Sequence, residues 1–463
     1  MKLKSVPLSG VSPAYAHQTE TTTFILKTPR CLITSDPGTG KTRSVLDALV
    51  ARKKSGLSSA VLVIAPLSIL EAAWGDDIKK FQPDIKYGVA YASNRAKIFS
   101  DGSFDLIVTN FEAVNFLCKN QEYLKNFNTL VVDEFTAFKN RSSKRSKNLK
   151  KIISHFDHRI FMSGTPNTNT ILDLWHPVLC VDDGDRLGKR FFGFRGQVCT
   201  PKFNGFANEW IDKPGIEEAV AQLLSDINIR HALEDCIDLP DNVTRIMHTN
   251  LTRDVKQMYD TLAEESVLYT NQGTINAVNA GARVKKLLQL VSGAVYDELG
   301  DIKYIHQNRY DMIMDLLEVR KHSIVAFNWK HERNALTQLA DKKGFSYEVI
   351  DGETPAHKRV DIVDRFQAGQ IKVLFAHPQS ASHGLTLTKA ATCIWCSPTY
   401  NAEHFQQFNR RIYRAGQSSK TETILIAARN TWEEKVYEKL NGKLGKMENL
   451  LNVLNKLHNQ EVV

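Results

Sequence analysis

Short runs of consecutive apolar residues, without polar alternation, recur along the first third of the chain. They are rich in Val, Ile and Leu, which is typical of strands buried on both faces, as in a parallel sheet. Segments of helical length and pattern lie between them, such as 42–53 and 68–81. This alternation predicts a doubly wound α/β lobe. The expected strands are 32–35, 60–65, 104–109, 129–133 and 159–163.

The alternating pattern stops near residue 180, and a second α/β series begins near residue 305. Between them, 182–215 combines Gly, Arg and Lys with Phe and Trp, which predicts an insertion, and helical patterns follow at 215–227 and 252–271. We expect the second series to have strands at 323–328, 346–350, 372–376, 392–397 and 422–427. Apolar residues at helical spacing predict one or two amphipathic helices over 431–457. The predicted parts are a first lobe at 1–245 with an insertion at about 182–240, a second lobe at 246–440, and a helical tail at 441–463.

Size and composition agree with this division. The chain has 463 residues, of which 42% are hydrophobic and 24% charged, so two or three domains can each bury a core. It contains neither a run of eighteen apolar residues nor a secretory signal, so we expect no membrane association and a cytoplasmic location. The net charge of +9 favours a polyanionic partner.

The seven cysteines are odd in number and irregularly spaced, which favours reduced thiols. Cys393 and Cys396 form a C-x-x-C that would suit zinc or redox chemistry. No second pair stands at a fitting distance, and their apolar surroundings are typical of a buried strand, so we favour core cysteines.

The segment Ser35-Asp-Pro-Gly-Thr-Gly-Lys-Thr42 follows an expected strand and begins an expected helix, as a phosphate-binding loop requires. Gly38, Thr39 and Gly40 would direct backbone N–H groups at phosphates, helped by the helix N-terminus. Lys41 would reach the β- and γ-phosphates of ATP, and the Thr42 hydroxyl would bind Mg²⁺. The alternative is a Gly-rich turn before a helix.

Asp133 and Glu134 follow an expected strand about ninety residues after this loop. A carboxylate there can hold Mg²⁺ through water, which we assign to Asp133. Its neighbour Glu134 can orient and deprotonate the attacking water. An acidic pair after a strand is common and is weak evidence alone. The phosphate-binding loop upstream makes the assignment much stronger.

Several further motifs, in the right order over roughly residues 13–440, give the chain a resemblance to the Swi/Snf group of helicase superfamily 2. The resemblance implies two RecA-like α/β lobes, each a mostly parallel sheet with helices on both faces, plus small helical insertions. The compact length resembles phage or bacterial members of the group. The matching segments are 61–70 with Trp74, 109–112, 133–140, 162–169, 173–175, 239–241, 324–329, 351–352 with Arg359 and Phe366, 380–388 and 407–417.

The resemblance also assigns roles. Arg411 and Arg414 would be arginine fingers that stabilise charge on the γ-phosphate. Gln18 would read adenine through its amide, and Gly384 would contribute to the nucleotide site. The group usually has Gly at Ser382 and Asn at Thr386; both replacements are small and polar, so DNA contacts remain open to them. The residues implied to contact the DNA backbone are Pro66, Ser68, Thr109, Asn110, Asn328, Ser380 and Thr386.

The stretch 139–151 holds seven Lys or Arg and no acid. Phosphate contacts from Lys139, Arg141 and Lys144 are one interpretation, and a solvated basic face is the other. Aromatic residues interleave with cations further on. These aromatic side chains would either stack on unpaired bases or pack the interior of a small subdomain. They are Phe191, Phe192, Phe194 and Phe203, among Lys189, Arg190, Arg195 and Lys202.

The leading hypothesis is a monomeric enzyme that hydrolyses Mg²⁺–ATP to move on double-stranded or branched DNA, with little sequence specificity. The resemblance favours tracking along duplex DNA without strand separation, whereas a small phage-type enzyme would remodel or unwind junctions. A non-catalytic DNA-binding protein with a decayed ATP site and an RNA helicase are the alternatives.

Overall fold

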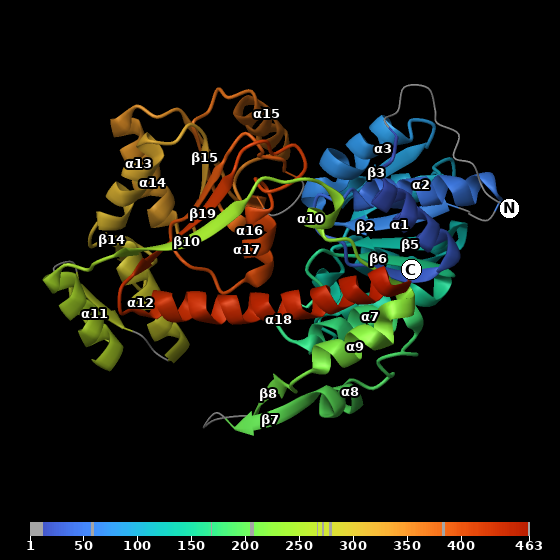
Figure 1. The fold of residues 1–463 in the computed structure, drawn as a ribbon, viewed down its shortest axis with the longest axis horizontal. Coiled ribbons are helices and arrows are strands. Elements are labelled where there is room, and N and C mark those ends of the chain that lie inside the picture. Colours follow the sequence, from blue (N-terminus) through green and yellow to red (C-terminus); the bar gives the residue numbers. More distant parts are fainter. Residues whose placement is uncertain are drawn as a thin grey trace. The chain divides into compact units, whose positions relative to one another are not determined.

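The structure is a computed structural model that describes residues 13–56, 60–167, 169–203, 208–265, 267–270, 273–276, 280–381 and 385–461. The chain divides into two compact units, Met1–Asp238 together with Lys443–Val463, and Leu239–Gly442. Figure 1 shows the helices and strands of both units. Among the described residues, no helix is both long enough and apolar enough to cross a membrane.

The first unit is built on a parallel sheet with the strand order β3-β4-β2-β5-β6-β1-β9. Each of the five expected strands overlaps a strand of this sheet, and the short β3 and β9 were not predicted. The strands are β1 (Arg30–Ile33), β2 (Ala60–Ala65), β3 (Tyr87–Ala90), β4 (Leu106–Asn110), β5 (Phe127–Asp133), β6 (His158–Met162) and β9 (Asn228–Ile229).

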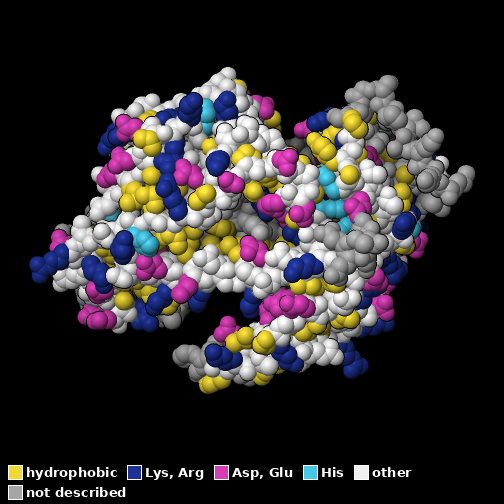
Figure 2. All heavy atoms as spheres, viewed as in Figure 1, with side chains coloured by type: hydrophobic (Ala, Val, Ile, Leu, Met, Phe, Trp, Pro, Cys, Tyr) yellow, Lys and Arg dark blue, Asp and Glu magenta, His cyan; other side chains and the backbone are white. Residues whose placement is uncertain are grey.

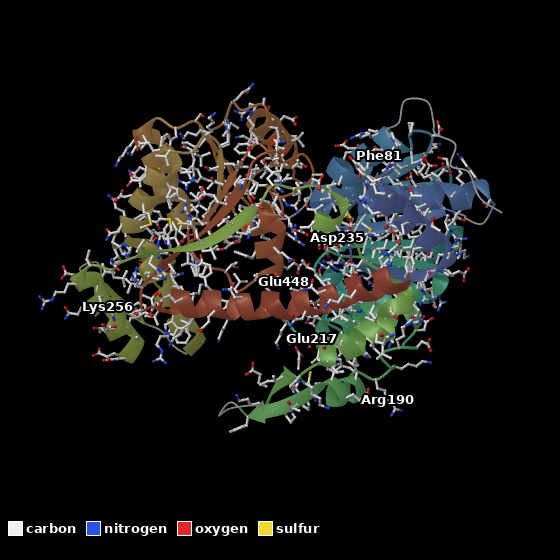
Figure 3. All side chains as sticks on the ribbon, in the orientation of Figure 1. Phe81, Arg190, Glu217, Asp235, Lys256 and Glu448 are labelled. Atoms are coloured by element: carbon white, nitrogen blue, oxygen red, sulfur yellow. The ribbon has the colours of Figure 1, made fainter. Side chains whose placement is uncertain are left out.

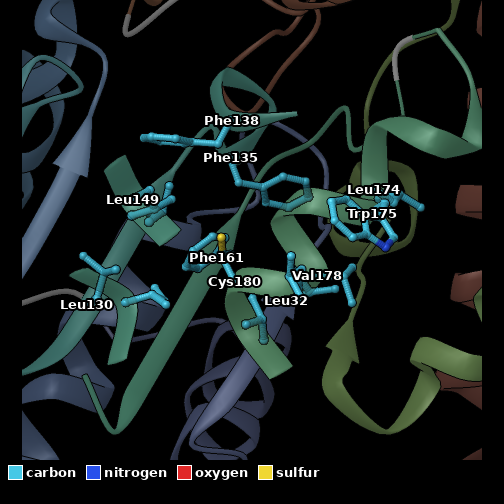
Figure 4. Close-up of a cluster of buried hydrophobic side chains, with 14 of the residues drawn as sticks. Leu32, Leu130, Phe135, Phe138, Leu149, Phe161, Leu174, Trp175, Val178 and Cys180 are labelled. Atoms are coloured by element: carbon cyan, nitrogen blue, oxygen red, sulfur yellow. The ribbon is translucent and has the colours of Figure 1, made fainter. Parts of the chain in front are cut away.

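Alternate residues of these strands enter two separate cores because side chains alternate across a sheet. In β2, Val61 and Val63 face one core, whereas Leu62 and Ile64 face the other. The first core is covered by α1 (Ala16–Lys27), α2 (Lys41–Lys54) and α3 (Asp76–Phe81). The second core, shown in Figure 4, is covered by α4 (Arg95–Ser100), α5 (Ala113–Lys119), α6 (Lys144–Ile152), α7 (Trp175–Asp182), α8 (Phe191–Val198) and α9 (Ile216–Leu224).

The second unit has its own parallel sheet, with the order β10-β19-β18-β15-β17-β16. All five expected strands are present, and β10 adds an unpredicted edge. The strands are β10 (Asn242–Thr249), β15 (Ser323–Ala326), β16 (Tyr347–Ile350), β17 (Val373–Ala376), β18 (Thr392–Trp395) and β19 (Thr421–Ala428). Its further helices are α13 (Asn308–Glu318), α14 (Lys330–Lys343), α15 (Ala356–Gln367), α16 (Pro378–Ala381) and α17 (Ala402–Asn409).

The two sheets with helices on their faces confirm the predicted α/β class with two RecA-like lobes. One face of the second sheet packs on α13 and α14 through Ile313, Met314 and Leu336. On the other face, Trp395 packs on two rings of α17. Its ring centroid lies 4.9 Å from the centroid of Phe405 and 5.3 Å from that of Phe408.

Two helix predictions were wrong in detail. In place of one helix over 68–81, a 3-10 turn (η1, Leu67–Ile69) and a π-helical turn (η2, Leu70–Gly75) precede α3, and they carry Trp74 into the interior. The helix expected at 252–271 ends early, as α11 (Arg253–Glu265). Its last part forms β11 (Val267–Thr270), which pairs with β12 (Gly273–Asn276), because the sequence Val-Leu-Tyr-Thr favours a strand.

The range 182–240 contains α8, a two-stranded sheet of β7 (Cys199–Phe203) and β8 (Asn208–Asp212), α9, β9 and α10 (Leu233–Cys236). It is therefore only partly an insertion, because β9 pairs with β1 in the main sheet. A second small helical layer, α11 with α12 (Ala280–Ser292), packs with the hairpin β13 (Ala294–Tyr296) and β14 (Ile302–Tyr304) in the second unit.

The predicted tail is one continuous helix, α18 (Trp432–Glu461), drawn in red in Figure 1. Its beginning belongs to the second unit, where Glu433 forms a fully buried ion pair with Arg309 at 2.7 Å. Residues from Lys443 onward belong to the first unit. There Leu450 and Leu454 belong to the same buried core as residues of α7 and α9.

The C-x-x-C is part of the core. Cys393 lies on the face of β18 that carries Trp395, and its Sγ is 3.3 Å from Asn409 Oδ1. Cys396 lies in the opposite core with Ile394. Burial raises the pKa of both thiols above the ordinary value. Since the two side chains lie on different faces of the sheet, they do not form a metal-binding pair.

Candidate active site

The predicted phosphate loop lies between β1 and α2 and turns sharply at Gly40, which precedes the first residue of the helix. Gly40 has a left-handed backbone with φ of 80°, and a Cβ atom there would come within 2.1 Å of Gln18 Nε2. Only glycine fits such a position without strain. Thr39 closes the turn, because its hydroxyl donates to the Asp36 carbonyl at 2.9 Å. Gly38 also has a left-handed backbone, with φ of 94°.

Lys41 extends back over this loop from the first turn of α2. Its ammonium donates to the carbonyl oxygens of Ser35 at 2.8 Å and Asp36 at 3.1 Å. Burial lowers the pKa of Lys41, and the negative charges of Glu134, Asp133 and Asp36 oppose that shift. The structure thus brings the lysine near both carboxylates of the acidic pair. Thr42 follows in the same helical turn and is half-buried.

Asp133 is the last residue of β5 and is almost fully enclosed. The indole N–H of Trp74 donates to its Oδ2 at 2.9 Å. Burial, and after it the charge of Glu134, raises the pKa of Asp133 above its ordinary value, against the effects of the indole and Lys41. Two adjacent carboxyl groups in a buried position favour a bound cation or a proton. Sequence analysis noted Trp74 but did not identify this contact.

Glu134 has a left-handed backbone with φ of 56°, which is unusual for a residue with a side chain. Its carboxylate accepts a hydrogen bond from the Ser163 hydroxyl at 2.8 Å, between Oγ and Oε2. Ser163 follows β6, the strand beside β5. The next residue is Gly164, where a Cβ atom would lie 2.6 Å from Pro37 Cδ of the phosphate loop. Close packing at this glycine therefore brings the serine and the loop to the same edge of the sheet.

Asp36 is a further site residue that sequence analysis did not single out. Arg230, which follows β9, donates to Asp36 Oδ1 at 2.9 Å and to the Thr34 carbonyl at 2.6 Å. The Leu233 amide donates to Asp36 Oδ2 at 3.1 Å. These buried contacts hold the beginning of the phosphate loop against the last strand of the sheet. No local signal could have identified Arg230, because nearly two hundred residues separate it from its partners.

Gln18 lies in α1 and is buried against the phosphate loop. Its amide nitrogen donates to the Thr39 carbonyl at 3.2 Å, and its oxygen accepts from the Tyr15 amide at 3.1 Å. The structure therefore brings the predicted adenine-reading residue into contact with the loop.

The two predicted arginine fingers lie together in the second unit. Arg411 and Arg414 both donate to the carbonyl oxygen of Leu385, at 3.1 Å and 3.0 Å. Arg411 is buried and also donates to the Gln407 carbonyl at 2.8 Å, whereas Arg414 is half-buried. Gly384, predicted to contribute to the nucleotide site, lies outside the described residues, as does Ser382.

The predicted DNA contacts of the first unit lie where strands β2 and β4 end, at the edge of the sheet that carries Asp133. Pro66 and Ser68 follow β2, and Ser68 is half-buried in η1. Asn110 ends β4 and accepts from Arg95 at 2.6 Å. Thr109 is fully buried, and its hydroxyl donates to the Ala90 carbonyl. Its side chain is therefore enclosed, and Asn110 is the more exposed of the two.

The basic stretch forms α6 and the turn before it. Lys144 begins the helix and is exposed, as are Lys147, Lys150 and Lys151, and the basic side chains border one shallow hollow. Lys139 pairs with Asp173 at 3.6 Å. The guanidinium of Arg141 lies over the Phe191 and Phe192 rings, 4.4 Å and 4.8 Å from their centroids. Arg141 thus packs on aromatic rings, whereas the α6 lysines extend into solvent.

Some aromatic residues of 191–203 pack inside a small subdomain, and others are exposed as base-stacking residues would be. Phe194 is buried, and the Phe191 ring packs at 5.4 Å from that of Trp175, which supports a packed subdomain. Phe192 and Phe203 are 63% and 68% exposed, as stacking residues would need to be. Arg195 lies 3.8 Å from the Trp210 ring and stabilises the subdomain by a cation–π contact.

The candidate DNA contacts of the second unit follow β15 and β17. The Asn328 amide donates to the Ser397 carbonyl and hydroxyl oxygens, at 3.1 Å and 3.0 Å. The Ser380 carbonyl accepts from Arg359 at 3.2 Å. Ser380 and Thr386 are both half-buried.

Comparison with known proteins supports the resemblance noted above. Residues 17–294 match the SNF2-related domain, and residues 308–416 match the helicase conserved C-terminal domain. Protein p41 of Acyrthosiphon pisum secondary endosymbiont phage 1 is 26% identical, over 93% of this chain and 96% of its own length. A chromodomain-helicase-DNA-binding protein 1-like of Danio rerio is 23% identical over 89% of this chain.

This chain covers nearly all of the phage protein but only 41% of the Danio rerio protein. One similar solved structure is the SWI2/SNF2 ATPase core of Sulfolobus solfataricus in complex with dsDNA, with a TM-score of 0.47 and 22% sequence identity. The alignment covers 97% of this chain and 95% of the Sulfolobus solfataricus chain. The match to the SNF2-related domain extends over more than half of the chain. The matched residues include the phosphate loop and the acidic pair, which lie at one edge of the first sheet. The chain belongs to the SNF2-related family of helicase-like ATPases.

Proposed function

We propose that this protein hydrolyses Mg²⁺–ATP and uses the reaction to move on double-stranded or branched DNA. The observation that carries the proposal is the half-buried Lys41 ammonium at the N-terminus of α2, with the charges of Glu134, Asp133 and Asp36 around it. A helix N-terminus and a lysine attract phosphate, and an adjacent carboxylate can activate water. This combination is what hydrolysis of a nucleoside triphosphate requires.

The residues present fit Mg²⁺. The candidate ligands are oxygen atoms, the Thr42 hydroxyl directly and the Asp133 carboxylate through water, and Mg²⁺ prefers such ligands and retains water. Burial, and after it the charge of Glu134, raises the pKa of Asp133, so a cation beside this carboxylate would favour its ionised form. When bound, the ion would polarise the phosphates and offset that charge.

The protein's own groups take the remaining roles. Backbone amides of Gly38, Thr39 and Gly40, with Lys41, would hold the phosphates. Glu134 would accept a proton from the attacking water, in an orientation that its hydrogen bond from Ser163 maintains. Gln18 would contact adenine, and Arg411 and Arg414 would stabilise charge on the γ-phosphate. Gly384 keeps the nucleotide role that the family implies.

For DNA we propose contacts to the phosphate backbone, which carry little sequence information. The exposed lysines of α6 supply charge without a neighbouring acid in their own helix. We retain Pro66, Ser68, Asn110, Lys139, Arg141, Lys144, Asn328, Ser380 and Thr386 as candidates. For the segment at the end of β4 we place the contact at Asn110, which retains 9% exposure, whereas the Thr109 side chain is fully enclosed.

The test is steady-state ATP hydrolysis with no nucleic acid, single-stranded DNA, linear duplex, forked DNA and RNA, at one salt concentration. We expect strong stimulation by duplex or fork, and loss of turnover in Glu134→Gln with ATP binding retained. Glu122→Gln is the matched control, since Glu122 is exposed and precedes β5 at the opposite edge of the sheet.

Near-normal hydrolysis by Glu134→Gln would refute the assignment of the base. Absence of stimulation by any DNA would favour a DNA-binding protein without a coupled motor, and stimulation by RNA alone would favour an RNA helicase. Strand displacement from a labelled fork separates the two DNA activities. An ATP-dependent displaced strand indicates junction unwinding, and its absence at every junction indicates tracking along duplex.

A further inference from the structure

Three side chains with metal-binding atoms come together in the first unit, although they are far apart in the sequence. Glu20 belongs to α1, His231 follows β9, and His458 lies near the end of α18. Their candidate ligand atoms all lie within 4.8 Å of one another. Figure 2 shows histidine side chains gathered beside α10, the helix on which Figure 3 labels Asp235.

The Glu20 carboxylate lies between the two imidazoles. Its Oε1 is 3.0 Å from His458 Nε2, and its Oε2 is 3.9 Å from His231 Nε2. The imidazole rings are perpendicular, with centroids 5.1 Å apart. Ligand atoms at about 2.1 Å from a tetrahedral Zn²⁺ are separated by roughly 3.4 Å. The two separations from Glu20 bracket this value, so small side-chain movements would place the three ligand atoms around one ion, with water as the fourth ligand.

His231 provides an independent indication of a ligand. Its side chain is nine-tenths buried, and Nε2 has no hydrogen-bond partner although it faces Glu20. A buried polar atom without a partner is costly and calls for an explanation. Burial, and then the nearby His458, His17 and Arg230, lowers the pKa of His231 to about 4.

The neighbouring charged groups already have partners. Arg230 donates to Asp36 and the Thr34 carbonyl, and Asp235 accepts from Asn455 at 2.9 Å. The third imidazole of the group, His17, makes a 2.8 Å hydrogen bond from Nε2 to the Thr39 carbonyl. These contacts leave Glu20, His231 and His458 as the set whose ligand atoms converge.

We propose that Glu20, His231 and His458 bind a divalent transition-metal ion of the Zn²⁺ class. Two imidazole nitrogens and one carboxylate oxygen are a donor set that such ions prefer over Mg²⁺. The site is separate from the proposed Mg²⁺ ligands Thr42 and Asp133, and it does not depend on ATP hydrolysis. Its occupancy fastens the end of α18 to α1 and to the segment after β9.

The experiment uses the full chain without nucleotide, after treatment with a chelator and in the presence of excess Mg²⁺. Zn²⁺ is added and binding is measured by calorimetry, metal content and the zinc-induced shift in melting temperature. We expect one equivalent per chain in the wild type. His458→Gln and Glu20→Gln should each weaken binding by at least about 100-fold, because each removes one ligand from a half-buried position.

His357→Gln is the matched control, because His357 is exposed on α15 outside this cluster, and it should bind zinc as the wild type does. The zinc-induced shift corrects for any loss of stability that a substitution causes without metal. Co²⁺ serves as a second probe, since a thiolate charge-transfer band would place the metal on a cysteine such as Cys236. That band, or zinc binding that survives both His458→Gln and Glu20→Gln, would overturn the proposal, as would absence of stoichiometric binding in the wild type.

Discussion

The Ser163 hydroxyl donates a hydrogen bond to the carboxylate of Glu134, with 2.8 Å between Oγ and Oε2. Ser163 also accepts from the Thr165 amide at 3.2 Å, so its hydroxyl is held by the loop that follows β6. The orientation of the proposed catalytic base is therefore set by the adjacent strand as well as by its own strained backbone.

Replacing Ser163 by Ala should lower kcat for ATP by about tenfold, because Glu134 would lose the contact that orients it. KM for ATP should change little, since the phosphate loop is untouched. Steady-state kinetics measure both constants. Ser146→Ala is the control, because Ser146 is equally buried but donates to the Phe138 carbonyl. An equal kcat loss in the control would show that general destabilisation is responsible.

Asp133→Asn should raise the stability of the nucleotide-free protein at pH 8 while it abolishes ATP hydrolysis. The folded-state pKa of Asp133 is raised, so its ionised form destabilises the fold above that pKa, and the effect vanishes below the unfolded-state pKa. The gain should be on the order of 1 to 3 kcal/mol at pH 8 and should disappear towards pH 4. Thermal unfolding across this pH range tests it, with exposed Asp84→Asn as a control that should show no such trend.

Reversing charge at Lys144 and Lys147 should weaken DNA affinity uniformly across sequences and flatten its salt dependence. Each lost phosphate contact lowers the slope of log K against log salt by about 0.9. Lys125→Glu is the control, because Lys125 is exposed just before β5, at the sheet edge opposite Asp133. DNA affinity measured over a salt series tests this prediction. If the lysines form only a solvated face, the substitutions would leave both the affinity and its salt dependence unchanged.

Arg414→Ala should reduce kcat by about a thousandfold, as expected for an arginine that acts in the transition state, with only a small decrease in melting temperature because Arg414 is half-buried. Arg411→Ala should lower both kcat and the melting temperature, because the buried Arg411 guanidinium also donates to the Gln407 and Leu385 carbonyls. Arg410→Ala, at a neighbouring arginine that lies over the Tyr413 ring, provides the control. If all three variants lose turnover equally, neither arginine can be assigned the role.

Glu433→Ala should destabilise the second unit by about 3 to 5 kcal/mol, because it leaves the fully buried Arg309 without its ion-pair partner. Glu434→Ala at the adjacent, partly exposed position should cost much less. Thermal unfolding of the two variants provides the comparison. Similar losses in both would show that the beginning of α18, and not the ion pair, determines the effect.

Local patterns predicted much of the fold because the strands of a parallel sheet are buried on both faces and are therefore continuously apolar. They did not predict β9, which has only two residues and is recognisable as a strand through its pairing with β1. The phosphate loop and acidic pair were identifiable because each has a short sequence signature. The contacts of Trp74 with Asp133 and of Arg230 with Asp36 were not, because they join residues that only the folded sheet brings together.

The division of α18 between the two units has a consequence for synthesis on the ribosome. Leu450 and Leu454 complete a core whose other residues lie before position 230, so the first lobe lacks part of its interior until the whole of the second has been made. The nascent first lobe must therefore expose an apolar patch throughout that interval. The core of the first lobe therefore cannot be completed before Leu450 and Leu454 have been made, after the residues of the second lobe.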